Sequence, residues 1–278
     1  MNLIEPTYLR YVHDSLGKGS LNAENAAALP YGFIGLYEEA FQSNIPISKR
    51  QSTLKRLAIW ALFKGGASTY LASQILNESQ EDTKSLIDSF SSWFNTTDSN
   101  KYILYHDRLR TYLLQKLSSH ELQMLNEQII SYLEKALKAQ KGDEAEIYAL
   151  EHLSTHMATE SQMNSNYQRL NDFANQESLW PRQVSISREY KWSQQALQYS
   201  IKEGARRQHE MNTLSSTVNS VKLTQEEENS VNQILNFLNE GDYKTSLVRA
   251  ESFKGERLSL TYLLMIHELT VGTSKSSH

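Results

Sequence analysis

Apolar residues recur every three or four positions along most of the chain, and this spacing predicts a mainly α-helical protein. The pattern breaks at Gly- and Pro-containing segments, which divides the chain into residues 1–48, 49–118 and 119–278. The first zone is predicted to be a small helical lid-like subdomain, with one helix that ends at Gly17, a short helix from Asn22 to Ala28 and a third that ends before Pro46. The apolar face of the third helix is formed by Ile34, Tyr37, Ala40 and Phe41.

The middle zone combines three short predicted helices with an extended segment. The first helix covers residues 54–62, and Ser68 is placed to cap the second. The third begins near Glu81 and Asp82, and its apolar positions are Leu86, Ile87, Phe90, Trp93 and Phe94. A polar turn at 96–100 followed by an aromatic and β-branched segment predicts a hairpin. Three helices followed by a hairpin is the order of a winged helix.

The third zone is predicted to contain one helix after another. The first has apolar residues at Leu122, Leu125, Ile129, Leu133 and Leu137. Further helices are predicted around residues 147–157, 170–173 and 192–201, and a polar stretch at 211–226 precedes the next one. That helix runs into a Gly-Asp-Tyr turn at 241–243, which resembles the turn of a tetratricopeptide hairpin. Because three copies at a spacing of ~34 residues are missing, we expect a repeat-like helical array.

The composition agrees with long helices and excludes several classes of protein. Only 11 Gly and 4 Pro occur, whereas turn-dense β-folds need more of both. The absence of Cys excludes disulfide scaffolds, thiolate zinc sites, Fe–S clusters and Cys nucleophiles. A net charge of −4 gives no electrostatic reason to coat nucleic acid or an anionic membrane. The longest apolar run, residues 57–63, is shorter than the ~20 residues that span a bilayer, so we expect a cytoplasmic protein without a membrane partner.

The motifs that would indicate an enzyme are missing. A phosphate-binding loop needs Gly-x4-Gly-Lys-Ser/Thr, and the segment Ser-Leu-Gly-Lys-Gly-Ser at 15–20 lacks the upstream glycine. Neither a Rossmann glycine fingerprint nor a Gly-x-Ser-x-Gly elbow occurs. His152 and His156 have the spacing of helical metal ligands, but Leu153 stands where a zinc protease has its general-base Glu. We therefore expect structural histidines, no metal ion and no catalytic residue.

A winged helix often places its third helix in the major groove of DNA. Here the predicted third helix carries Glu81, Asp82 and Asp88 against a single Lys84, a poor match to a groove lined with phosphates. Nucleic acid is therefore a disfavoured partner. A winged-helix DNA-binding transcriptional regulator with a helical partner domain, and a plain helical-repeat adaptor, are kept as alternative functions.

The segment 102–113, Tyr-Ile-Leu-Tyr-His-Asp-Arg-Leu-Arg-Thr-Tyr-Leu, resembles a junction in the STAND-type signalling NTPases, the NACHT and NB-ARC relatives. In that family a strand of the winged-helix domain passes into a helix at a Met-His-Asp motif. His106 and Asp107 match the last two residues of the motif, and Tyr105 replaces the Met.

Three further segments resemble the same family, in the same order. Residues 5–10, Glu-Pro-Thr-Tyr-Leu-Arg, are similar to the Asn-Pro-Leu-Tyr-Leu-Arg stretch that opens the helical lid. Residues 29–37 look like its Leu-Pro-x-Gly-Leu…Tyr segment, and residues 148–153 resemble the start of its helical superstructure. The resemblance covers roughly residues 3–160 and does not include the phosphate-binding core.

The resemblance implies a role for each matching residue. His106 would sense the β-phosphate of ADP, Asp107 would be its helix-capping partner, and Pro6 would contact the adenine. Because the chain lacks the phosphate-binding loop, it is expected to hold no cofactor alone and to meet ADP or ATP only with an NTPase core. The implied function is a non-catalytic regulatory, sensor and protein-interaction module with a protein partner or an NTPase core. The residues alone equally allow His106 to pack and Asp107 merely to cap a helix.

Overall fold

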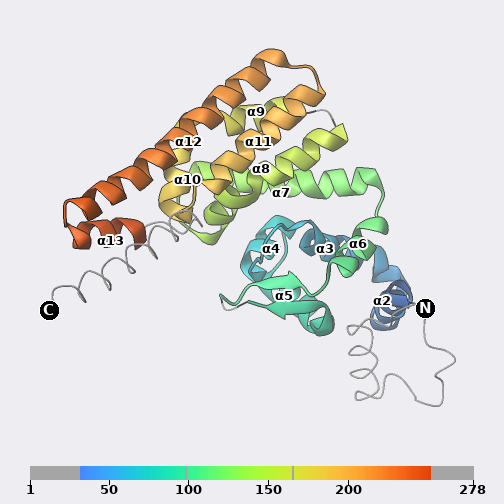
Figure 1. Ribbon diagram of the computed structural model, residues 1–278. Coiled ribbons are helices and arrows are strands. Elements are labelled where there is room, and N and C mark those ends of the chain that lie inside the picture. Colours follow the sequence, from blue (N-terminus) through green and yellow to red (C-terminus); the bar gives the residue numbers. More distant parts are fainter. Residues whose placement is uncertain (1–31, 98, 165, 252–278) are drawn as a thin grey trace, which may run out of the picture. The chain divides into compact units, whose positions relative to one another are not determined.

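The structure is a computed structural model that describes residues 32–97, 99–164 and 166–251 (Figure 1). These residues form twelve α-helices and one two-stranded antiparallel sheet. The expected mainly helical fold with a small hairpin is therefore confirmed. The helices that the sequence predicts before Gly17 and from Asn22 to Ala28 lie outside the described residues.

The chain divides into two compact units between Leu125 and Asn126, inside helix α7 (Ser119–Ala139). A reciprocal pair of hydrogen bonds sets the start of this helix. The Ser118 hydroxyl accepts from the Glu121 amide at 3.3 Å, and the Glu121 carboxylate accepts from the Ser118 amide at 3.0 Å. The Ser118 amide and hydroxyl both donate to the Glu121 carboxylate, and these two bonds lower the pKa of Glu121 to about 2. The expected division of residues 1–118 into two zones stays a prediction.

The first unit contains five described helices before α7 and both strands. They are α2 (Gly32–Asn44), α3 (Arg50–Leu62), α4 (Thr69–Leu76), α5 (Gln80–Ser89), β1 (Phe94–Thr96), β2 (Tyr102–Leu104) and α6 (Asp107–Gln115). The expected Ser68 cap is present, and Ser79 supplies a cap to α5 that the sequence analysis did not predict. The Ser68 hydroxyl accepts from the Leu71 amide at 3.0 Å, and the Ser79 hydroxyl accepts from the Asp82 amide at 3.0 Å.

Aromatic rings form much of the core of the first unit. The rings of Phe90 and Trp93 lie 4.6 Å apart, and Tyr37 of α2 lies 5.9 Å from Trp93. Trp60 of α3 meets Phe94 of β1 edge-to-face at 5.3 Å. These contacts join α2, α3 and the hairpin into one core, which explains why the apolar run at 57–63 is buried on all sides.

The hairpin begins earlier than the sequence pattern predicted. The third helix was expected to include Trp93 and Phe94, but α5 ends at Ser89, Trp93 lies in a short 3₁₀-helix and Phe94 pairs with Leu104 in the sheet. The spacing of apolar residues in so short a segment does not distinguish a helix from a strand, and in the structure Phe94 packs on Trp60 from the strand. Ala67 adds an isolated antiparallel bridge to Tyr102 on the other side of β2.

The second unit continues from α7 as antiparallel helical hairpins. Its other helices are α8 (Glu144–Asn164), α9 (Tyr167–Ala174), α10 (Trp180–Ser187), α11 (Lys191–Arg206), α12 (Glu210–Asn239) and α13 (Tyr243–Glu251). Helix α11 packs against α8, α9 and α12, as Figure 1 shows. The Gly-Asp-Tyr turn separates α12 from α13 as expected, with Gly241 at a φ of +80°.

The polar stretch at 211–226 is not a break between helices. It lies inside α12, which is 30 residues long. No Gly or Pro occurs from Glu210 to Asn239, so nothing in the backbone ends the helix there. The buried face of this part of α12 is largely polar, because Ser216 and Asn219 both bond to Asn175 at 2.9 Å.

Small side chains let α11 approach its neighbours closely. Ser193, Ala196, Ser200 and Gly204 are buried along it. A methyl group added at Gly204 would lie 2.6 Å from both the Tyr167 hydroxyl of α9 and the Thr213 hydroxyl of α12. Gly204 is therefore the point where three helices meet with no room for a side chain.

We expect Gly204→Ala to destabilise the protein by roughly 2 kcal/mol, although Ala favours a helix by ~1 kcal/mol over Gly. The Tyr167 ring is buried and its hydroxyl donates to the Ser200 carbonyl at 3.2 Å, so the Tyr167 side chain cannot easily move away from an added methyl group. Urea unfolding followed by circular dichroism measures the change. Lys202→Ala, at an exposed position of the same helix, is the control and should be near neutral; an unchanged midpoint for Gly204→Ala would contradict this packing.

Candidate functional site

His106 lies where the hairpin passes into a helix, between the end of β2 and the first residue of α6. Its side chain is the N-cap of α6, because the ring Nδ1 accepts a hydrogen bond from the Arg108 amide at 3.0 Å. The backbone of His106 is extended there, as capping geometry requires. The imidazole therefore satisfies one of the amides that the start of the helix leaves without a partner.

The two other residues of the expected site are placed differently. Asp107 is the first residue of α6 and its side chain is 99% exposed, 4.0 Å from the Arg110 guanidinium. The cap is thus His106 itself, not Asp107, which contributes a negative charge in the first turn. Pro6 lies outside the described residues. The structure brings His106 and Asp107 together only as neighbours in the chain.

Arg110, which the sequence analysis did not assign, follows His106 on α6. The Arg110 amide donates to the His106 carbonyl at 3.2 Å, so Arg110 lies one turn along α6. Its guanidinium donates to the Phe63 carbonyl, at the end of α3, at 2.9 Å. Loss of hydration, and to a smaller extent the Arg110 charge, lower the pKa of Lys64, which follows Phe63 in the chain.

His156 is a core residue of the second unit. Its Nδ1 lies 2.9 Å from the Asn126 amide oxygen, and its Nε2 lies 3.3 Å from the Tyr148 hydroxyl. The His152 ring packs at 5.0 Å from Trp192 and 4.7 Å from Tyr148. Among the residues that the structure describes, no group of three His, Asp or Glu side chains is placed to share a metal ion. The two histidines contribute to packing.

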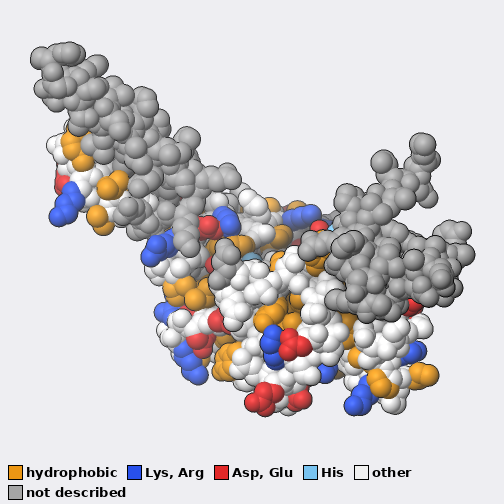
Figure 2. Space-filling model, turned by 90° about the horizontal axis from the view of Figure 1, so that it is seen from below, with side chains coloured by type: hydrophobic (Ala, Val, Ile, Leu, Met, Phe, Trp, Pro, Cys, Tyr) orange, Lys and Arg blue, Asp and Glu red, His pale blue; other side chains and the backbone are white. Residues whose placement is uncertain are grey.

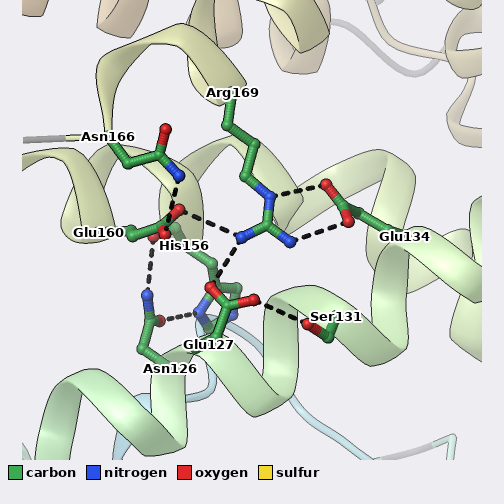
Figure 3. Close-up of polar contacts among 8 residues, drawn as sticks. All are labelled: Asn126, Glu127, Ser131, Glu134, His156, Glu160, Asn166 and Arg169. Carbon is green, nitrogen blue, oxygen red and sulfur yellow. Dashed lines mark hydrogen bonds and ion pairs between the residues drawn. The ribbon is translucent and has the colours of Figure 1, made fainter.

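The largest polar cluster of the second unit surrounds Arg169 of α9 (Figure 3). Its guanidinium binds both carboxylate oxygens of Glu134 at 2.8 Å. On the other side its Nη1 reaches Glu127 at 2.7 Å and Glu160 at 3.5 Å. Asn166 also donates to Glu160, at 3.3 Å. One cation thus joins two carboxylates of α7 and one of α8 to α9.

Charge in this cluster is unbalanced, because three carboxylates share one guanidinium. Partial burial raises the pKa of Glu127, but hydrogen bonds from Arg169 and Ser131 outweigh this effect and hold it below 4.5. The Glu160 side chain is only 4% exposed. The cluster therefore holds helices together, and its cation is fully committed to them.

Three further cations, which stand next to another basic residue in the sequence, are also engaged in ion pairs. Arg56 pairs with Glu78 at 2.7 Å, Lys55 with Glu121 at 3.2 Å and Arg206 with Glu203 at 2.7 Å. On the face that Figure 2 shows, Lys and Arg side chains are interspersed with Asp and Glu, and no extended area of one charge forms among the described residues.

No protein-family model matches the chain, and neither a curated protein nor a solved structure matches it significantly. The resemblance of residues 102–113 to a signalling NTPase therefore stays a proposal. Every helix in the described part of the chain is too short or too polar to cross a membrane.

We expect Arg169→Met to destabilise the protein by roughly 3 kcal/mol, because it leaves a buried Glu160 and the bidentate Glu134 without their cation. Arg169→Lys keeps the charge but not the paired bonds, so its stability should lie between that of Arg169→Met and that of the unaltered protein. Chemical denaturation gives the values, with Lys135→Met at an exposed position of α7 as the control. A loss no larger than that of the control would show that the cluster does not hold the helices.

Acid should weaken the same cluster. The pKa of Glu127 is lower in the folded protein than its ordinary value of 4.5, so its contribution is present above that pH and is lost as the pH falls through the folded pKa. We expect the melting temperature to fall below pH 4.5, and to fall less steeply in Glu127→Gln than in the unaltered chain. Parallel pH dependences for the two proteins would contradict this expectation.

Proposed function

We propose that this chain is a non-catalytic regulatory and sensor module of a STAND-type NTPase, working with an NTPase core or another protein partner in the cytoplasm. One observation carries the proposal. His106 and Asp107 stand at a strand-to-helix junction, at the end of a helix, helix, helix, hairpin series. In the family that the sequence resembles, the corresponding motif stands at such a junction.

The order of elements in the first unit supports a winged-helix arrangement. Helix α3 is followed by the bridge residue Ala67, then α4, α5, β1 and β2. Ala67 exchanges backbone hydrogen bonds with Tyr102 at 3.1 and 2.8 Å, so a short extended position adjoins β2 between the first and second of these helices. A winged helix has its first strand at this place in the chain.

The surroundings of His106 support an anion sensor. The imidazole is fixed by its cap, and Arg110, one turn along α6, carries a positive charge. A β-phosphate that approaches the start of α6 also meets the positive end of the helix dipole. The chain has no phosphate-binding loop, so tight binding and hydrolysis of the nucleotide are assigned to a separate core, and this chain supplies only weak contacts to the phosphate.

Duplex DNA is a less suitable ligand for the first unit. On α5, Lys84 is paired with Asp88 at 2.9 Å and bonds to the Tyr102 hydroxyl at 3.1 Å. Arg56 beside this helix is held by Glu78 and by the Asp82 carbonyl. These bonds leave α5 with a net negative face, which a phosphate-lined groove repels.

Calorimetric titration with ADP tests the sensor role. We expect weak binding, about millimolar, because the chain supplies phosphate contacts without a core. His106→Asn should weaken it by roughly tenfold, since Asn keeps a capping acceptor and removes the imidazole. Equal affinities of the two proteins, or no binding to either, would contradict the sensor role and favour a plain helical adaptor.

Thermal unfolding of the same variants separates capping from sensing. His106→Ala should lose about 1 kcal/mol of stability, because the Arg108 amide loses its acceptor, whereas His106→Asn should stay close to the unaltered chain. The proteins are also assayed for ATP hydrolysis. Turnover that survives His106→Ala would contradict a non-catalytic module.

A further inference from the structure

Helix α12 exposes an apolar stripe along the first part of its length. Met211, Leu214, Val218 and Val221, here called the α12 stripe, are 77%, 57%, 47% and 53% exposed. Steps of three, four and three residues place them on one face of the helix, as in two heptads of a coiled coil. No charged residue occurs from 211 to 221, a length of about three helical turns or ~16 Å. Exposed apolar surface of this kind commonly marks a contact with another molecule.

The opposite side of α12 packs inside the second unit. Ser216 bonds to Ser200 of α11 at 2.9 Å, and the Asn219 amide donates to Asn175, at the end of α9, at 2.9 Å. Leu223 is fully buried on the same side. Figure 1 shows α11 running alongside α12. The α12 stripe therefore lies on the side of the helix that faces away from α9 and α11.

Polar residues limit the α12 stripe at both ends. Further steps of four and three residues past Val221 lead to Gln225 and Glu228, which are polar and exposed. At the other end, Glu210 is the first residue of α12. A partner must therefore match an uncharged length of about three turns, and it has little freedom to slide along the helix.

The spacing of the α12 stripe has the symmetry that a second copy of the chain requires. Its steps of three, four and three residues read the same from either end. A second α12 turned by 180° therefore places Met211 opposite Val221, and Leu214 opposite Val218 in the next layer. Each layer then combines a longer side chain with a short β-branched one, which fills the interface evenly. A parallel pair would instead place each residue against its own copy, in layers of unequal size.

We propose that the α12 stripe joins two copies of this chain through an antiparallel pair of α12 helices. Such a contact uses the same surface of both copies and closes on itself, as most dimer interfaces do. Ser215 and Thr217 beside the stripe are small and exposed, so the two helices can approach closely.

Charge agrees with the antiparallel direction. Glu210 of each copy then lies at the level of Lys222 of the other copy, whereas a parallel pair would bring like charges to the same level. Lys222 also bonds to Glu177 of its own chain at 3.0 Å, and both side chains of that pair are exposed. The contribution of charge is therefore small, and the apolar layers provide most of the contact.

The proposed dimer is weak because its contact is short. Four apolar side chains from each copy, over about three turns, bury less than the ~800 Å² per partner of a standard interface. We expect a dissociation constant of about 10 to 100 µM. Association would then depend on the concentration of the chain.

Sedimentation equilibrium of the full chain tests the proposal, over concentrations of roughly 1 to 300 µM that span the expected constant. Val218→Lys places two like charges at the centre of the contact and should raise the dissociation constant roughly tenfold or more. Val248→Lys is the matched control, because it adds the same charge at an exposed valine of α13, outside the stripe, and should leave the constant unchanged. A chain that stays monomeric, or a dimer as strong in Val218→Lys as in the control, would overturn the proposal.

Cross-linking tests the direction of the pair, since the chain has no native Cys. An antiparallel pair places residue 211 of one copy against residue 221 of the other and leaves identical positions ~15 Å apart along the helix. Under mild oxidation, a mixture of Met211→Cys and Val221→Cys chains should form the mixed covalent dimer roughly tenfold faster than either chain alone forms its own. Mass spectrometry of unreduced peptides identifies the bonds.

Two results of the cross-linking experiment would also contradict the proposal. Equal rates for mixed and single chains would show that only random collision joins them. Faster reaction of each chain with its own copy would show a parallel pair. Circular dichroism of each reduced variant confirms that it is folded, and all of the substituted positions are exposed, so the substitutions remove little core packing.

Discussion

The second unit depends on how closely α11 can lie against its neighbours. Gly204 leaves space for the Tyr167 hydroxyl of α9 and the Thr213 hydroxyl of α12. Ser200 then fits between Asn171 and Ser216, to which it bonds at 3.2 and 2.9 Å. Small polar residues contribute little apolar area, so the interface is held by satisfied hydrogen bonds at short range. Such an interface specifies one register, because a shift of one residue along α11 would leave several buried hydroxyl and amide groups without partners.

Local signals in the sequence predicted the ends of elements well. Ser68 caps α4, the polar turn separates the strands, and Gly241 separates α12 from α13, because each acts on backbone within a few residues of itself. Predictions that needed tertiary context were less successful. Phe94 packs in the core from a strand rather than a helix, and the polar stretch at 211–226 is helical because its partners are the polar side chains of α9 and α11.

The candidate site divides in the same way. The position of His106 at the start of α6 followed from the motif, whereas its role as the cap depends on a side-chain rotation that no sequence spacing records. The Arg169 cluster had no signal in the sequence at all, because Glu134, Glu127 and Glu160 lie on two helices and up to 42 residues away in the chain. Only the folded arrangement shows that one guanidinium serves all three.

The cap on α6 has a consequence for the chemistry of His106. A ring nitrogen that accepts a hydrogen bond from the Arg108 amide carries no hydrogen of its own. In the neutral imidazole the hydrogen then resides on Nε2, so the helix selects one tautomer of the ring. Formation of α6 thus leaves Nε2 as a hydrogen-bond donor, and an anionic oxygen needs a donor as its partner.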